Sequence, residues 1–149
     1  MLLGAAAGCT GDREPAASDW LHGPHGGHTA VMSEGAGFEI EFTLDATRRR
    51  IVLYVHEEGG AAAYPLPVDS LSGQFKADGR STDVTFAADP RSDDPPGHAS
   101  RFVLALDTLP QQLLASDEFE LMISYRGDGG AATASIPHKN DHAHSYRHD

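Results

Sequence analysis

Apolar and polar residues alternate along the chain between residues 38 and 137, with the period of two that is typical of half-buried β-strands. The run FEIEFTLD, residues 38–45, places an apolar side chain at every second position. The run 51–56 repeats this pattern, and the segment 46–50 between the two runs predicts a hairpin with a basic tip. Similar alternation predicts strands at residues 84–88, 102–106 and 119–125, and weaker patterns predict strands at 29–33, 71–75 and 131–136.

Segments rich in glycine and proline separate the predicted strands, as expected for turns. The number and spacing of these strands predict an all-β fold, and we expect an immunoglobulin-like antiparallel β-sandwich of seven or eight strands with flexible N- and C-terminal segments. Residues 110–115 predict one short helical turn, because a proline suits its first position. If the first strand pairs with the last, antiparallel pairing would place His28 near His138, whereas parallel pairing would separate them.

The chain has 149 residues, which is enough for one domain with a hydrophobic core. Residues 10–19 are polar and have no periodicity, so they are expected to form a tether. We therefore expect a signal-like segment at 1–9, a tether with a His/Gly motif at 10–27, the β-sandwich domain at 28–137 and a histidine-rich tail at 138–149.

The net charge of the chain limits the kinds of partner that it can bind. Asp and Glu number 22 against 11 Lys and Arg, which gives a formal net charge of −11. Such a chain repels phosphate backbones, so nucleic acid is excluded as a partner. Acidic side chains at alternate strand positions are expected to be solvated rather than to form a catalytic carboxylate pair. They are Glu39, Glu41, Glu118 and Glu120.

The N-terminus carries the only cysteine, which excludes an intrachain disulfide framework. Cys9 follows the small residues Ala6, Ala7 and Gly8, and this arrangement resembles a bacterial lipoprotein signal, in which the cysteine becomes acylated. No apolar run reaches the roughly 20 residues that span a bilayer, so membrane contact is expected only through this lipid anchor. The expected location is the periplasm or the cell surface. The alternative is an apolar N-terminus with an incidental free thiol.

Histidines gather near both ends of the chain. Neutral imidazole is the commonest protein ligand for divalent transition metals, and clustering raises the affinity. The motif HGPHGGH is rich in Gly and Pro and therefore predicts tight turns rather than a helix, while two histidines at an interval of two in the tail would face one side of an extended chain. The predicted metal ligands are His22, His25 and His28 near one end and His138, His142, His144 and His148 near the other.

The predicted ligands limit which metal ions the site can bind. Because Cys9 is expected to be acylated, a thiolate site for Cu(I) is not expected, and Zn(II), Cu(II), Ni(II) and Co(II) remain as candidates. The alternative is that both segments are solvated and bind metals weakly with no biological role. The remaining histidines are not expected to be ligands, since His56 ends a predicted strand at the surface and His98 follows prolines in a loop.

Residues 22–60 resemble a segment of the periplasmic adaptor (membrane-fusion) subunits of heavy-metal efflux pumps, and of small bacterial lipoproteins with the same module. The resemblance rests on His25-Gly26-Gly27, on the acidic strand Phe38 to Phe42 and on the strand Val52 to Val55, and it covers about 40 of 149 residues. It implies a β-rich periplasmic module for metal handling, with metal binding at His25. The helical hairpin and lipoyl-like regions of the adaptors have no counterpart here.

These patterns together favour a non-catalytic lipoprotein that binds a divalent transition metal through its histidine-rich ends. The alternative is an acidic β-sandwich that binds another envelope protein, with incidental histidines. An enzyme is not expected, because a catalytic metal needs ligands on rigid elements. The sequence also lacks a zinc-protease motif, a phosphate-binding glycine loop and a nucleophile elbow.

Overall fold

The computed structural model describes residues 23–33, 35–127 and 130–139. Two short helical segments, η1 (Leu106–Thr108) and α1 (Gln111–Leu114), lie between β6 and β7, and α1 falls within residues 110–115, where the sequence predicts a helical turn. Within the described residues, no helix has the length and apolar character needed to cross a membrane. The strands are β1 (His28–Val31), β2 (Phe38–Asp45), β3 (Arg50–Glu57), β4 (Ser70–Ala77), β5 (Arg80–Ala88), β6 (Arg101–Ala105), β7 (Glu118–Gly127) and β8 (Gly130–Lys139).

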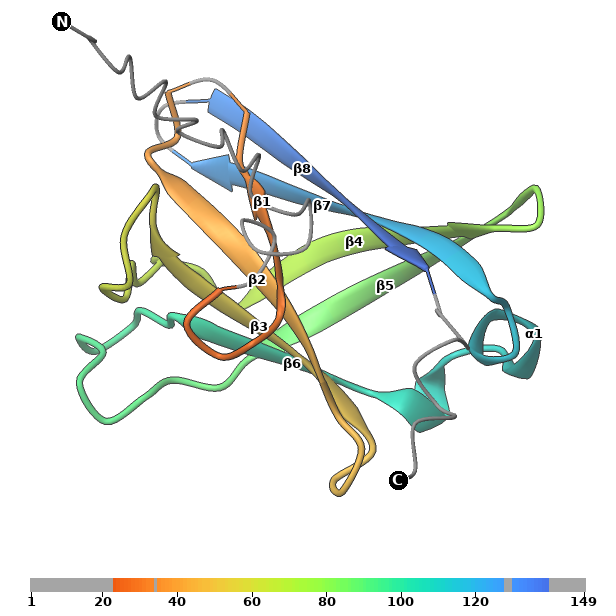
Figure 1. The fold of residues 1–149 in the computed structure, drawn as a ribbon. Coiled ribbons are helices and arrows are strands. Elements are labelled where there is room, and N and C mark those ends of the chain that lie inside the picture. The colour runs from red at the N-terminus through yellow and green to blue at the C-terminus, as the bar shows by residue number, and fades with distance from the viewer. Residues whose placement is uncertain (1–22, 34, 128–129, 140–149) are drawn as a thin grey trace, which may run out of the picture.

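The eight strands form one antiparallel sheet in the order β1-β2-β3-β6-β5-β4-β7-β8 (Figure 1). The sheet curls until its two edge strands meet. Just beyond β1, the Ser33 N–H donates to the Thr133 carbonyl of β8 over 2.8 Å, and the Thr133 N–H donates to Ser33 Oγ over 2.9 Å. The molecule is therefore a nearly closed barrel.

The predicted all-β class and the eight predicted strand segments are confirmed. Two four-stranded halves, β1-β2-β3-β6 and β5-β4-β7-β8, face each other as in a sandwich and are joined through a short pairing, Ala87 with Val103 and Ala88 with Phe102. The strand order differs from that of an immunoglobulin-like domain, in which the second and third strands belong to different sheets. Here only residues 46–49 separate β2 from β3, so these strands form a hairpin.

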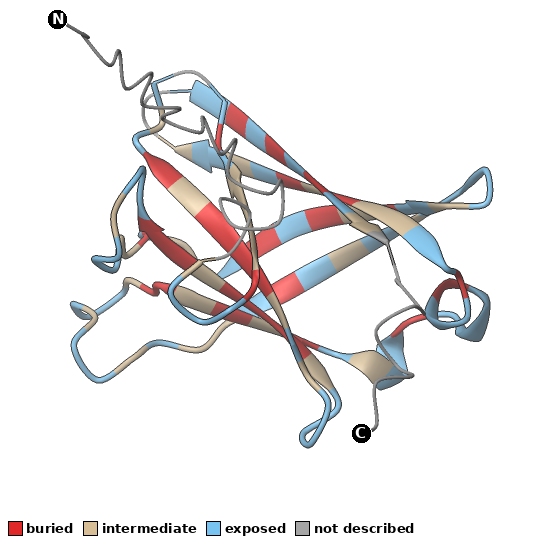
Figure 2. Ribbon diagram, viewed as in Figure 1, coloured by how far each residue is buried: buried red, intermediate tan, exposed pale blue. Residues whose placement is uncertain are grey.

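Alternate side chains of each strand fill the interior of the barrel, and buried positions accordingly recur as bands along the strands in Figure 2. On β2 the inward residues are Phe38, Ile40 and Phe42, which are at most 4% exposed. Because the side-chain period of a strand is two, Glu39 and Glu41 on the same strand point to the outer face. This outer face carries the first polar cluster described below.

Candidate functional site

Four polar side chains lie together on the outer face of the β2–β3 hairpin. The strand register pairs Glu39 with His56 and Glu41 with Tyr54. Glu41 is 0% exposed and His56 is 2% exposed. The prediction that Glu41 is solvated is therefore wrong, as is the prediction that His56 lies at the surface. Both predictions assumed that nothing covers this face of the sheet.

Residues 23–27 form a loop that covers Glu41. The Oε1 atom of Glu41 accepts hydrogen bonds from the backbone N–H groups of His25, over 2.8 Å, and Gly27, over 2.9 Å. The Oε2 atom lies 2.8 Å from Nδ1 of the His25 ring. The loop is also closed on itself, since the Gly23 N–H donates to the Gly27 carbonyl. A buried carboxylate needs such donors to offset its loss of hydration, so Glu41 and the loop stabilise each other.

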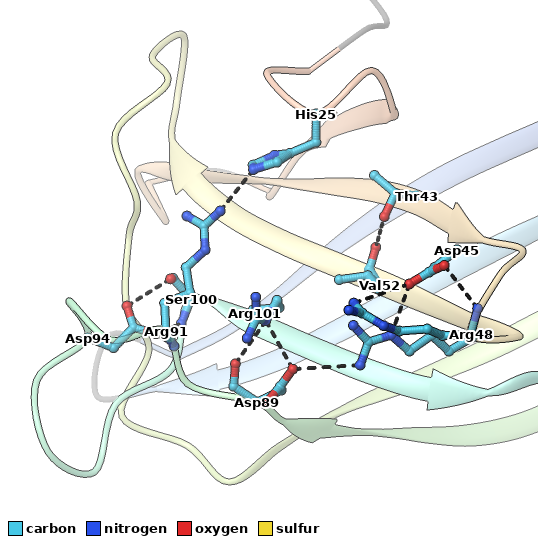
Figure 3. Close-up of polar contacts among 11 residues, drawn as sticks. His25, Thr43, Asp45, Arg48, Val52, Asp89, Arg91, Asp94, Ser100 and Arg101 are labelled. Atoms are coloured by element: carbon cyan, nitrogen blue, oxygen red, sulfur yellow. Dashed lines mark hydrogen bonds and ion pairs between the residues drawn. The ribbon is translucent and has the colours of Figure 1, made fainter.

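Both ring nitrogens of His25 are engaged. Its Nε2 lies 2.8 Å from Nη2 of Arg91, as Figure 3 shows. Because a guanidinium only donates, this Nε2 accepts, and the ring proton resides on Nδ1 and points to Glu41. The His25 ring also stacks on Tyr54, with centroids 3.6 Å apart, and the Arg91 guanidinium lies 5.0 Å from the centre of the same Tyr54 ring.

His56 extends this arrangement into a series. Its Nδ1 lies 2.9 Å from Glu39 Oε1, and its Nε2 lies 3.6 Å from Glu41 Oε2. Carboxylates and imidazoles therefore alternate across the outer face, in the order Glu39, His56, Glu41 and His25, and Arg91 ends the series. We call these five residues the outer-face series. The series also contacts the covering loop and the Tyr54 ring, which is the pattern of a structural anchor.

The position of Arg91 is set by the loop that joins β5 to β6. Asp94 Oδ2 accepts the N–H groups of Arg91 and Ser100, and Asp94 Oδ1 accepts the Ser100 hydroxyl (Figure 3). Partial burial acts to raise the pKa of Asp94, but these hydrogen bonds outweigh burial and hold the pKa below its ordinary value. The loop is thus ordered around one carboxylate.

Further ion pairs lie on the same side of the sheet (Figure 3). Asp45 Oδ2 lies 3.4 Å from Arg50 Nε, and Asp89 Oδ2 lies 3.0 Å from Arg101 Nε. The backbone N–H of Arg48 is the main cause that lowers the pKa of Asp45. The basic tip predicted for the hairpin is therefore paired with acidic neighbours.

A second histidine site lies where β1 meets β8. The rings of His28 and His138 are in edge contact, with centroids 5.4 Å apart and planes at 79°. His138 also stacks on Phe119, with centroids 4.7 Å apart. Of the two arrangements considered from the sequence, the antiparallel one holds, because Ser33 meets Thr133 and His28 meets His138. One histidine from each end of the chain therefore reaches the same place.

The predicted metal ligands thus divide into three groups. His28 and His138 lie together, whereas His25 belongs to the outer-face series. Across residues 23–33, 35–127 and 130–139, no three His, Cys, Asp or Glu side chains are grouped so that they could hold a metal ion. The remaining predicted ligands and the predicted lipidation site lie outside the described residues; they are His22, His142, His144, His148 and Cys9.

The sequence reasoning missed Glu41, Tyr54 and Arg91 as partners of the His25 loop. One signal was available, because a hairpin with a short turn sets the cross-strand register and so places Glu39 opposite His56. Nothing in the sequence pattern indicated Arg91, which reaches His25 from a loop 66 residues further along the chain.

Comparison with known proteins does not assign this chain to a family. No family model, no curated protein and no solved structure matches it. The resemblance of residues 22–60 to efflux adaptor subunits therefore stays a prediction, and the function has to be inferred from the geometry.

Proposed function

We propose that this protein binds a divalent transition metal without catalysing a reaction, through imidazoles from its two histidine-rich ends. The observation that carries the proposal is the contact between His28 and His138, whose ring centroids are 5.4 Å apart. In the proposal, rotation of the two side chains turns one nitrogen of each ring toward a common ion. Neutral imidazole suits Zn(II), Cu(II), Ni(II) and Co(II).

A complete metal site needs more ligands than these two, since structural zinc sites have four. In the proposal they come from the neighbouring histidines of the sequence. His142 and His144 follow His138 closely, and His22 and His148 are further candidates. His25 has a different role, because its hydrogen bonds to Glu41 and Arg91 fix the loop that leads into His28.

The proposed setting of this metal site is the bacterial envelope. The chain would be acylated at Cys9 and held at a membrane by the lipid, with the barrel in the periplasm or at the cell surface. The resemblance of residues 22–60 to heavy-metal efflux adaptors supports a role in metal handling. The net charge of −11 favours the approach of cations.

Isothermal titration of the full chain with Zn(II), Cu(II), Ni(II) and Co(II) tests the proposal. We expect micromolar or tighter binding of at least one ion, and binding at least about tenfold weaker, or about 1.4 kcal/mol, in the double variant His28→Ala/His138→Ala. The matched control is His98→Ala, because the His98 ring lies 3.1 Å from the Pro96 carbonyl in a loop away from the pair. Circular dichroism confirms that each variant is folded.

Two results would contradict the proposal. One is the absence of micromolar binding in the unmodified chain. The other is unchanged affinity in the folded double variant, which would exclude His28 and His138 as ligands. The first result would favour the alternative of an acidic interaction module with incidental histidines, whereas the second would assign the metal to other ligands.

A further inference from the structure

The end of the barrel beside α1 contains an apolar cavity of about 380 Å³. Core side chains of the strands form its walls, and the segment between β6 and β7 contributes four leucines, Leu106, Leu109, Leu113 and Leu114. The mouths of β-barrels are a common place for small-molecule sites, whose volumes begin at about 300 Å³. The main lining residues are Phe42, Ile51, Phe75, Leu109, Leu113 and Phe119.

Two exposed apolar side chains lie at the rim of this cavity. Among the described residues, three large hydrophobic side chains are exposed, namely Val31, Leu44 and Leu114. Leu44 is 59% exposed and Leu114 is 43% exposed, and both line this cavity. The apolar surface thus continues from the interior to the solvent, as expected where an apolar ligand enters.

One cationic side chain lines the same cavity. Arg49 lies at the tip of the β2–β3 hairpin, and its Nη2 is 3.4 Å from Asp107 Oδ1. The side chains of this pair are 69% and 78% exposed, and ion pairs exposed to this extent contribute little stability. An incoming carboxylate is therefore able to replace Asp107 as the partner of Arg49, and it would form charge-assisted hydrogen bonds with the guanidinium.

We infer that this cavity binds an aliphatic carboxylate of medium chain length. The hydrocarbon chain lies against the phenylalanine and leucine side chains, and the carboxylate pairs with Arg49 at the mouth. The combination of an apolar interior with one cation at the rim selects this class of ligand over sugars or polyanions. The inference does not rest on metal binding, although His138 lines the cavity as well as contacting His28.

Titration calorimetry with decanoate, below its micelle concentration and with a chelator present, tests the inference on the full chain. Decanol and acetate serve as comparison ligands, because one lacks the charge and the other lacks the chain. We expect decanoate to bind more tightly than either.

Two variants address the apolar cavity. Leu113→Trp fills the cavity and is expected to weaken decanoate binding by at least about tenfold. Leu114→Gln changes only the exposed rim, so it keeps the fold and is expected to weaken binding less. Thermal unfolding of each variant separates loss of the site from loss of the fold.

A matched pair of arginine variants addresses the charged group. Arg49→Gln is expected to weaken decanoate binding and to leave decanol binding unchanged. Arg48→Gln is the control, since Arg48 is adjacent in sequence, is 70% exposed and pairs with Asp45 rather than lining the cavity.

Three outcomes would overturn the inference. Absence of decanoate binding would exclude the ligand class, and equal binding to the folded Leu113→Trp variant would exclude the cavity. Equal effects of the two arginine variants would exclude Arg49 as the partner of the carboxylate. A dimer that becomes monomeric in Leu113→Trp would assign the cavity to a second copy of the chain instead.

Discussion

At the scale of single residues, the Glu41 carboxylate is fully buried. Loss of hydration disfavours a buried charge unless donors surround it. Glu41 meets two backbone N–H groups and one imidazole N–H, all within 2.9 Å. Two of these donors belong to the backbone of residues 23–27, so the carboxylate specifies the path of that loop as well as its side chains.

Glu41→Gln tests this role with almost no change in size. The variant places an amide NH2 group against one of the donors that now face a carboxylate oxygen. We expect the free energy of unfolding to fall by about 1–3 kcal/mol, because a buried donor loses its acceptor. Urea denaturation measures the change, and the control is Glu58→Gln, at an exposed position just after β3. A similar loss in both variants would argue against the anchoring role of Glu41.

Asp94 gives a prediction for the pH dependence of stability. Its pKa is lower in the folded chain than its ordinary value of 3.8. The ionised form therefore stabilises the fold above about pH 4, and this contribution is lost as the pH falls through the lower, folded-state pKa. We expect Asp94→Asn to be less stable than the unmodified chain at neutral pH, and the difference to shrink in acid.

Thermal unfolding from pH 3 to pH 7 measures this difference, with Asp93→Asn as the exposed neighbouring control. A difference between the Asp94→Asn variant and the unmodified chain that stays constant over the whole range would show that ionisation of Asp94 does not stabilise the loop.

At the scale of elements, the loop 23–27 and the β2–β3 hairpin form one unit. Gly26 has a φ of 77°, a conformation that disfavours side chains with a Cβ atom. Gly27 is buried against β2, and a Cβ atom there would collide with the carbonyl oxygen of Phe42. Glycine is therefore required at the two positions of the HGG motif for different structural reasons, and neither reason involves a metal.

Gly27→Ala is expected to displace the loop from β2. Since the colliding atom belongs to the backbone of a central strand, the loop has to move, and the cost of such overpacking is about 1–3 kcal/mol. Hydrogen exchange at the His25 amide, which donates to Glu41, should become faster. Gly60→Ala is the control, because a Cβ there makes only an ordinary contact of 3.5 Å with Glu57. Unchanged exchange at His25 would contradict the proposed close packing.

The β2–β3 hairpin shows which features the sequence pattern could predict and which it could not. The alternation in residues 38–45 and 51–56 predicted β2, β3 and their hairpin, because one buried face per strand is a local property with a period of two. The same rule assigned Glu41 to the outer face but could not indicate that a loop covers it. Burial of that face depends on residues 23–27 and on Arg91, which are distant in sequence.

At the scale of the whole molecule, closure of the sheet decides which histidines meet. β1 and β8 are the ends of an eight-stranded sheet, and its curl brings them together at Ser33 and Thr133. The same closure places His28 beside His138. A metal held there would join the two edge strands, so the proposed function and the completion of the barrel share one location.

The cavity also belongs to this scale. It lies where α1 folds beside the open end of the barrel, and its walls come from strands that are far apart in sequence. The amino-acid pattern predicted a helical turn at residues 110–115, but the space between its leucines and the phenylalanines of the strands exists only in the assembled barrel.

The sequence by itself determined the strands, the helical turn, the acidic charge and the placing of histidines near both ends, because each depends on residues that are near neighbours or on composition alone. Only the tertiary structure decided the strand order, the burial of Glu41 and His56, and the separation of His25 from the pair of His28 and His138. These features depend on contacts between segments that are distant in sequence. The free energies of such contacts add up over the whole barrel, and the contacts produce no periodic pattern in the sequence.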